Sequence, residues 1–139
     1  PGGEAGDGLA LICDMARAVF TVSEEVRFCY GHRLMDYVGR CARIHGHSYR
    51  ATITLAGVPD PVTGMLIDIG HLDTLLADTR DALDHRFLDE VPGLGPATLE
   101  NLCSFLWARL APSLPQLHRV TVSRDLSGDA CSFVGKATC

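Results

Sequence analysis

The sequence predicts an α+β domain in which a four-stranded antiparallel sheet carries two helices packed on one face. Four segments, 18–29, 48–55, 65–69 and 119–123, have the apolar and polar alternation or the short apolar runs of strands. After Gly70, and again after Thr98, apolar residues recur at the helical spacing of three or four. The order β-β-β-α-α-β groups both helices, which favours their packing together on one face.

The second segment gives the clearest strand signal. Its odd-numbered residues are apolar and its even-numbered residues are polar, as in a half-buried antiparallel strand. Residues 57–64 are rich in Pro and Gly and predict a turn. We therefore expect Met65–Ile69 to form a third strand and to make a hairpin with 48–55.

Capping residues mark the starts of both helices. Asp68 is a candidate N-cap for a helix that ends near Asp84-His85. Thr98 is a candidate N-cap for the second helix, with Glu100 in a first turn where the helix dipole favours an acid. Pro112 and Pro115 end that helix, and Val120 and Val122 indicate the last strand.

The composition restricts the class of protein. The net charge of −5 argues against a general binder of nucleic acid or of anionic membranes, and no apolar run approaches the roughly 20 residues of a membrane span. We expect a mobile segment at 1–15, a single domain at 16–139 and a cytoplasmic location. The six cysteines are widely spaced, so we expect thiols, with Cys29 and Cys103 as small buried hydrophobes.

Three histidines and a cysteine lie within sixteen positions and predict a zinc site. His45 and His47 are two apart, so on an extended chain they point to one side, and His32 supplies a third nitrogen. Three imidazoles with an open fourth position are typical of catalytic zinc. Two alternatives stay open: a closed structural site with Cys41 as fourth ligand, and ordinary surface and core histidines.

Several motifs in order resemble the superfamily of 6-pyruvoyl-tetrahydropterin synthase and 6-carboxytetrahydropterin synthase, which has the tunnelling fold. The resemblance covers roughly residues 18–135. It is carried by His32-Arg-Leu34, Cys41-x3-His45-Gly-His47-Ser-Tyr49, Asp60-Pro-Val-Thr-Gly64-Met-Leu-Ile-Asp68, Leu83-Asp84-His85-Arg-Phe-Leu88 and Thr98-Leu-Glu100-Asn101.

The resemblance implies a role for each matching residue. His32, His45 and His47 match the zinc ligands, and Cys41 matches the catalytic cysteine. Asp84 and His85 match the pair that completes proton transfer, although a histidine at a helix end also fits a simple C-terminal cap. Thr98 and Glu100 match positions that line the pterin pocket, and Glu100 equally suits the helix dipole. Members assemble as trimers that pair into hexamers.

The chain departs from the family pattern at the end of its last strand. The family places a glutamate there, which anchors the guanidine-like edge of the pterin. Counting from Val122 puts Arg124 at this position, whereas counting back from Phe133 puts Asp125 there. We favour Asp125, because an arginine offers only donors to the N–H donors of the ring. This choice requires one extra residue in the strand, such as a bulge.

The resemblance implies zinc-dependent conversion of 7,8-dihydroneopterin triphosphate to 6-carboxy-5,6,7,8-tetrahydropterin, a step of 7-deazaguanine (queuosine) biosynthesis. A nearby cation would lower the pKa of the Cys41 thiol and make the thiolate available as general base. The short Cys41-x3-His45 spacing favours the carboxy product. Two alternatives are triphosphate elimination to 6-pyruvoyl-tetrahydropterin and a paralogue that binds zinc and pterin without turnover.

Overall fold

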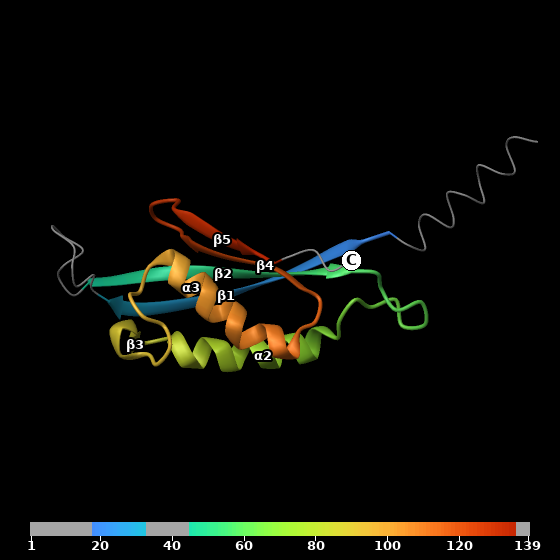
Figure 1. Ribbon diagram of the computed structural model, residues 1–139, viewed down its shortest axis with the longest axis horizontal. Helices are drawn as coiled ribbons and strands as arrows, with labels where there is room; N and C mark the ends of the chain where they lie inside the picture. Colours follow the sequence, from blue (N-terminus) through green and yellow to red (C-terminus); the bar gives the residue numbers. More distant parts are fainter. Residues whose placement is uncertain (1–17, 33–44, 136–139) are drawn as a thin grey trace, which may run out of the picture.

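The computed structural model describes residues 18–32 and 45–135, with the backbone alone for His32 and His45. These residues form a five-stranded sheet in the order β3-β1-β2-β4-β5, covered on one face by the helices α2 and α3 (Figure 1). The strands are β1 (Phe20–His32), β2 (His45–Gly57), β3 (Arg86–Phe87), β4 (Leu117–Arg124) and β5 (Ala130–Val134). The helices are α2 (Ile69–Leu83) and α3 (Leu99–Leu110). The α+β class with both helices on one face is therefore confirmed.

The long ribbon of β1 and β2 forms the centre of the sheet. Its two strands pair antiparallel without a register shift, from Phe20 opposite Gly57 to His32 opposite His45. Alternate residues of both strands face the helices and are buried, among them Phe28, Tyr49 and Ile53. Because side chains alternate along a strand, one face of the ribbon belongs to the core and the other is exposed.

Both helices begin at the caps that the sequence predicts. The Asp68 carboxylate accepts a hydrogen bond from the Gly70 N–H at 3.0 Å, and the Thr98 hydroxyl accepts one from the Asn101 N–H at 3.2 Å. Each bond satisfies an amide that the first helical turn leaves without a partner. The helices then bury leucine stripes against the sheet, which include Leu72, Leu76, Leu102, Leu106 and Leu110.

The predicted strand at Met65–Ile69 is wrong. Asp60 closes a local turn, in which its carboxylate accepts the Val62 and Thr63 N–H groups at 2.7 and 3.1 Å. The chain then goes directly to the N-cap of α2. No hairpin with β2 can form, because β1 and β4 occupy both edges of β2.

Two strands of the sheet were not predicted. β5 makes a second hairpin with β4, and the two-residue β3 lies parallel to β1, opposite Tyr30 and Gly31. The sheet therefore has four longer antiparallel strands plus one short parallel strand, and its third long strand follows the helices instead of preceding them. In the part of the chain that the structure describes, no helix is long and apolar enough to cross a membrane.

Candidate active site

The β1–β2 register places the three predicted zinc-ligand positions on one face of the ribbon. Positions 32 and 45 are direct partners, and position 47 is two residues further along β2 and opposite Tyr30. Direct partners and residues two apart share a face. This face is the helix-covered one, because it also carries Phe28, Tyr30 and Tyr49. Neighbouring positions on one face fit a metal held by three imidazoles, whose nitrogens lie about 2.0–2.1 Å from zinc.

His47 continues a row of buried aromatic rings. Its ring meets Tyr49 edge-on at a centroid distance of 5.5 Å, and Tyr30 stacks on Tyr49 at 4.3 Å. Burial and the neighbouring Tyr49 raise the pKa of Tyr30 far above its usual value, so this phenol stays neutral. The row gives His47 a rigid, apolar support on the side of the core.

Asp84 and His85 form a tightly held pair beside β1. The Asp84 carboxylate lies 3.0 Å from the His85 Nδ1 and accepts the Cys29 main-chain N–H at 2.9 Å. The His85 main-chain N–H donates to the Cys29 carbonyl at 2.7 Å. The bond from Cys29 is the main reason why the pKa of Asp84 lies below its usual value, and His85 lowers it further. An ionised Asp84 thus orients the ring and favours a proton on Nδ1.

The backbone of His85 has the left-handed conformation, with φ of 55°. This conformation is uncommon for a residue with a side chain, and it ends α2 sharply at its C-cap Asp84. The imidazole remains 82 % exposed, so Nε2 is accessible while Nδ1 faces Asp84. The alternative prediction was that Asp84-His85 only caps the C-terminus of α2. Asp84 does occupy the C-cap, but the exposed ring of His85 remains available for chemistry.

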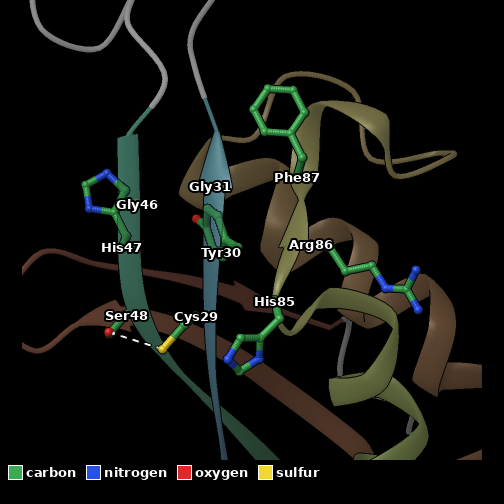
Figure 2. Close-up of a pocket in the computed structure, with 9 residues that line it drawn as sticks. All are labelled: Cys29, Tyr30, Gly31, Gly46, His47, Ser48, His85, Arg86 and Phe87. Carbon is green, nitrogen blue, oxygen red and sulfur yellow. Dashed lines mark hydrogen bonds between the residues drawn. The ribbon is translucent and has the colours of Figure 1, made fainter.

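Both His47 and His85 border a hollow of about 550 Å³, and Figure 2 shows His47 on the β2 side of the ribbon and His85 on the side of β1. It is lined by residues 29–31 of β1, 46–48 of β2 and 85–87. The structure thus joins one predicted zinc-ligand side chain with one member of the predicted proton-transfer pair. A small ligand in this hollow would meet the exposed imidazole of His85, which Asp84 holds at Nδ1.

Sequence reasoning missed Cys29, whose thiol lines this hollow. It was expected to be a small buried hydrophobe, but its side chain is exposed and lies 3.4 Å from the Ser48 hydroxyl (Figure 2). The signal was present, because Cys29 alternates with the buried Phe28 and Tyr30 and so must point the other way. Cys103, by contrast, is buried as expected.

Thr98 and Glu100 do not line the hollow. Thr98 caps α3 and Glu100 is exposed in its first turn, as helix chemistry alone would require. Figure 1 shows that α3 begins at the same end of the sheet as β3. Their predicted contact with a pterin stays a prediction.

Arg124, and not Asp125, occupies the last position of β4 on the helix-covered face. Arg124 is opposite Tyr49 and forms an ion pair with Asp129. The bulge required for Asp125 is absent, since residues 119–124 pair with β2 without a shift. The Asp125 carboxylate instead contacts two arginines of the ribbon's other face, Arg27 and Arg50, at 3.0 Å each.

The remaining predicted residues lie outside this description. Cys41 and the 1–15 segment are not among the described residues, and the side chains of His32 and His45 are not described. Within the described side chains there is no group of three potential metal ligands. The three expected ligand positions share one face of the ribbon, and the zinc itself stays a prediction.

Comparison with known proteins points to one family. The family model described as 6-pyruvoyl tetrahydropterin synthase matches residues 21–135. A 6-carboxy-5,6,7,8-tetrahydropterin synthase of Synechocystis is 32 % identical over 124 residues, with 83 % of this chain and 94 % of the relative covered. A 6-pyruvoyl tetrahydrobiopterin synthase of Dictyostelium discoideum is 34 % identical, with 72 % and 84 % covered.

A solved structure shares the fold. The 6-pyruvoyl tetrahydropterin synthase of Caenorhabditis elegans superposes with a TM-score of 0.78 at 24 % identity, and 87 % of this chain and 99 % of that chain are covered. The likeness places the β1–β2 ribbon, the two helices and the β4–β5 hairpin in the same architecture. The family-model match over residues 21–135 and the 32 % identical Synechocystis relative show that the chain belongs to the 6-pyruvoyl tetrahydropterin synthase family.

Proposed function

We propose that the chain is a zinc-dependent enzyme that converts 7,8-dihydroneopterin triphosphate to 6-carboxy-5,6,7,8-tetrahydropterin. The observation that carries this proposal is that His47 and His85, which is paired with Asp84, line one hollow at the end of the ribbon where positions 32 and 45 are partners. Family membership supports a tetrahydropterin synthase activity in general. The zinc, the carboxy product and its use in 7-deazaguanine biosynthesis are the finer parts of the proposal.

His32, His45 and His47 would hold the zinc. Bound zinc would supply Lewis acidity toward the two hydroxyl oxygens of the substrate's three-carbon side chain. The chain's own contribution is to fix the imidazoles, and Tyr30 and Tyr49 do so for His47 through ring contacts. An apolar support of this kind limits water access and keeps the ring orientation constant.

Two groups would move protons during the reaction. Cys41, four residues before His45, would act as the general base that removes a proton from the substrate side chain. His85 would hold or donate a second proton at Nε2, because Asp84 fixes Nδ1–H and stabilises the imidazolium that forms. Release of the triphosphate and carbon–carbon cleavage with loss of acetaldehyde, with uptake of one water, would then give the carboxy product, a lyase reaction.

The carboxy product is favoured over the pyruvoyl product by two observations. The Cys41-x3-His45 spacing is short, and the Synechocystis carboxy synthase matches over more of both chains than the Dictyostelium relative does. A second candidate function is binding without turnover. It is favoured by Arg124, which puts a donor where recognition of a ring N–H edge needs an acceptor.

We also propose that the chain forms a homo-oligomer, a trimer or a pair of trimers, in the cytoplasm. Both edges of the sheet are available among the described residues, since β3 pairs with only two residues of β1 and β5 is the opposite edge. Apolar side chains are exposed near both edges, with Phe20 53 % and Val134 59 % exposed. Such edges favour pairing with another copy, and complementary edges on one chain close into a ring.

The first prediction concerns turnover and product. Zinc-loaded protein should convert 7,8-dihydroneopterin triphosphate to the carboxy product, and Cys41→Ala should lower kcat by about 10²–10⁴-fold. Mass spectrometry of the product distinguishes carboxy- from pyruvoyl-tetrahydropterin. Cys131→Ser, a thiol outside the hollow, is the control and should keep the wild-type rate. Equal rates for wild type and Cys41→Ala would refute the role of the cysteine.

The second prediction concerns metal content. Purified protein should contain one zinc per chain by elemental analysis, and His47→Ala should lose most of it because one of three imidazole ligands is removed. His118→Ala, which changes a histidine outside the proposed ligand set, should retain the metal. Full zinc in the His47→Ala protein would show that the metal is bound elsewhere.

The third prediction concerns the Asp84–His85 pair. Asp84→Asn keeps an oxygen for the Cys29 N–H but turns an NH₂ group toward Nδ1, so it should favour the wrong tautomer and lower kcat by about 10²-fold or more. The pKa of Asp84 is below its usual value, so the carboxylate stays charged between pH 6 and pH 8. Titration of Asp84 itself should therefore add no pH dependence to the wild-type rate over that range. Asp78→Asn, an exposed residue of α2, is the control and should keep the wild-type rate, whereas equal rates for wild type and Asp84→Asn at pH 7 would contradict this account.

The fourth prediction concerns assembly. Light scattering of the purified chain should give a mass of three or six chains. Val134→Lys should shift it toward one chain, because a charge on an edge strand opposes strand pairing between copies. Val62→Lys, at a 91 % exposed position in the turn before α2, should leave the assembly unchanged. A wild-type monomer at micromolar concentration would refute the proposal.

A further inference from the structure

Cys103 and Cys131 lie next to each other where α3 packs on β5. Cys103 is 1 % exposed, and its thiol donates to the Cys131 carbonyl oxygen at 3.2 Å. Cys131 is opposite the buried Val122, so its side chain is on the face that α3 covers. The two thiols are thus neighbours across a helix–strand contact, and neither lines the hollow that holds His47 and His85.

Side chains of α3 pack directly on β5 next to this cysteine pair. The Trp107 ring of α3 contacts the Phe133 ring of β5 at a centroid distance of 4.7 Å. A Cβ atom on Gly135, just after β5, would lie 2.2 Å from the same indole. The Cys103 thiol also has the Cys131 thiol as a hydrogen-bonding neighbour, so the two sulfurs have the proximity that a disulfide requires.

The two thiols differ in reactivity. Cys131 is partly exposed, so a small reagent can reach it, whereas Cys103 is enclosed by the core. Burial raises the pKa of Cys103 to about 12, and the adjacent Cys131 contributes to this shift. Because the thiolate is the reactive species, exchange starts at Cys131 and Cys103 acts second.

We propose that Cys103 and Cys131 form a dithiol that a low-molecular-weight disulfide oxidises to an intramolecular disulfide between α3 and β5. The Cys131 thiolate attacks one sulfur of the reagent, a mixed disulfide forms, and the first reagent thiolate leaves. Cys103 then loses its proton and attacks the Cys131 sulfur, which releases the second reagent thiolate. The two cysteines are oxidised, the reagent is reduced to two thiols, and the protons of the cysteines end on those thiols.

The bond would close a loop from α3 to β5 that includes all of β4. Among the described strands β5 is an edge that pairs with β4, and α3 begins at Leu99, directly after its N-cap Thr98. A covalent link would tie this edge strand to the core and restrict the unfolded chain. The link is reversible, because excess thiol reverses each exchange step.

A variant with Cys13, Cys29, Cys41 and Cys139 changed to serine leaves only this pair and makes the test specific. We expect native protein treated with oxidised glutathione to lose two hydrogen atoms by intact-mass analysis, to show no free thiol after denaturation and to yield one peptide pair linked through Cys103 and Cys131. Dithiothreitol should restore both thiols. A chain that stays reduced, keeps a glutathione adduct or links only in denaturant would overturn the proposal.

Two single substitutions in this background test the order of the steps. With Cys103→Ser, Cys131 should accept glutathione and keep it as a stable mixed disulfide. With Cys131→Ser, Cys103 should stay unmodified in the native protein because it is enclosed by the core. Rapid modification of Cys103, or an unreactive Cys131, would overturn entry through Cys131. The readouts do not depend on zinc or on turnover, so they stand apart from the proposed enzyme activity.

Discussion

The antiparallel register between β1 and β2 is the constraint on which the candidate site depends. A slip of one residue would turn every side chain of one strand to the opposite face. Phe28, Tyr30 and Tyr49 prevent this slip, because each is buried and each large apolar side chain stabilises the fold by about 1.5–3 kcal/mol. The same core residues therefore keep positions 32, 45 and 47 on one face, so packing in the middle of the ribbon determines geometry at its end.

The second constraint is the attachment of the α2 terminus to β1. The left-handed backbone of His85 costs about 1–3 kcal/mol and persists only where the surroundings impose it. Here the Cys29 main chain supplies a donor to Asp84 and an acceptor for His85. These bonds offset the strain and fix the pair against the strand that also contributes to the hollow. The helix end is thus an element of the site as well as of the fold.

The parts of the fold that depend on local signals were predictable from sequence. Alternation predicted β2, and Asp68 and Thr98 predicted where the helices begin. The wrong prediction of a strand at Met65–Ile69 has a non-local cause. An apolar run can join a sheet only where a neighbouring strand has a free edge, and both edges of β2 are occupied by β1 and β4. β5 was missed because most of its residues are exposed, so it carries no alternation. Its place follows only from the turn after Arg124, which Asp129 closes by accepting the Arg124 N–H with its carbonyl.

In the site, the same distinction separates His47 and His85 from Arg124. Histidine spacing and the Asp84-His85 sequence are local signals, and the side chains of His47 and His85 both reach the hollow.

The choice between Arg124 and Asp125 needed the strand register. The register puts Arg124 on the face of Tyr49, with Asp125 among the arginines of the other face. A guanidinium only donates, so at that position it complements acceptors such as a ring carbonyl oxygen. The nearby Asp129 is already paired with Arg124, so an anion for the N–H edge of a ring has to come from another residue. Under the proposed function, the departure at one strand position would change which edge of a ring this end of the sheet can recognise, whereas His47 and the Asp84–His85 pair keep the places described above.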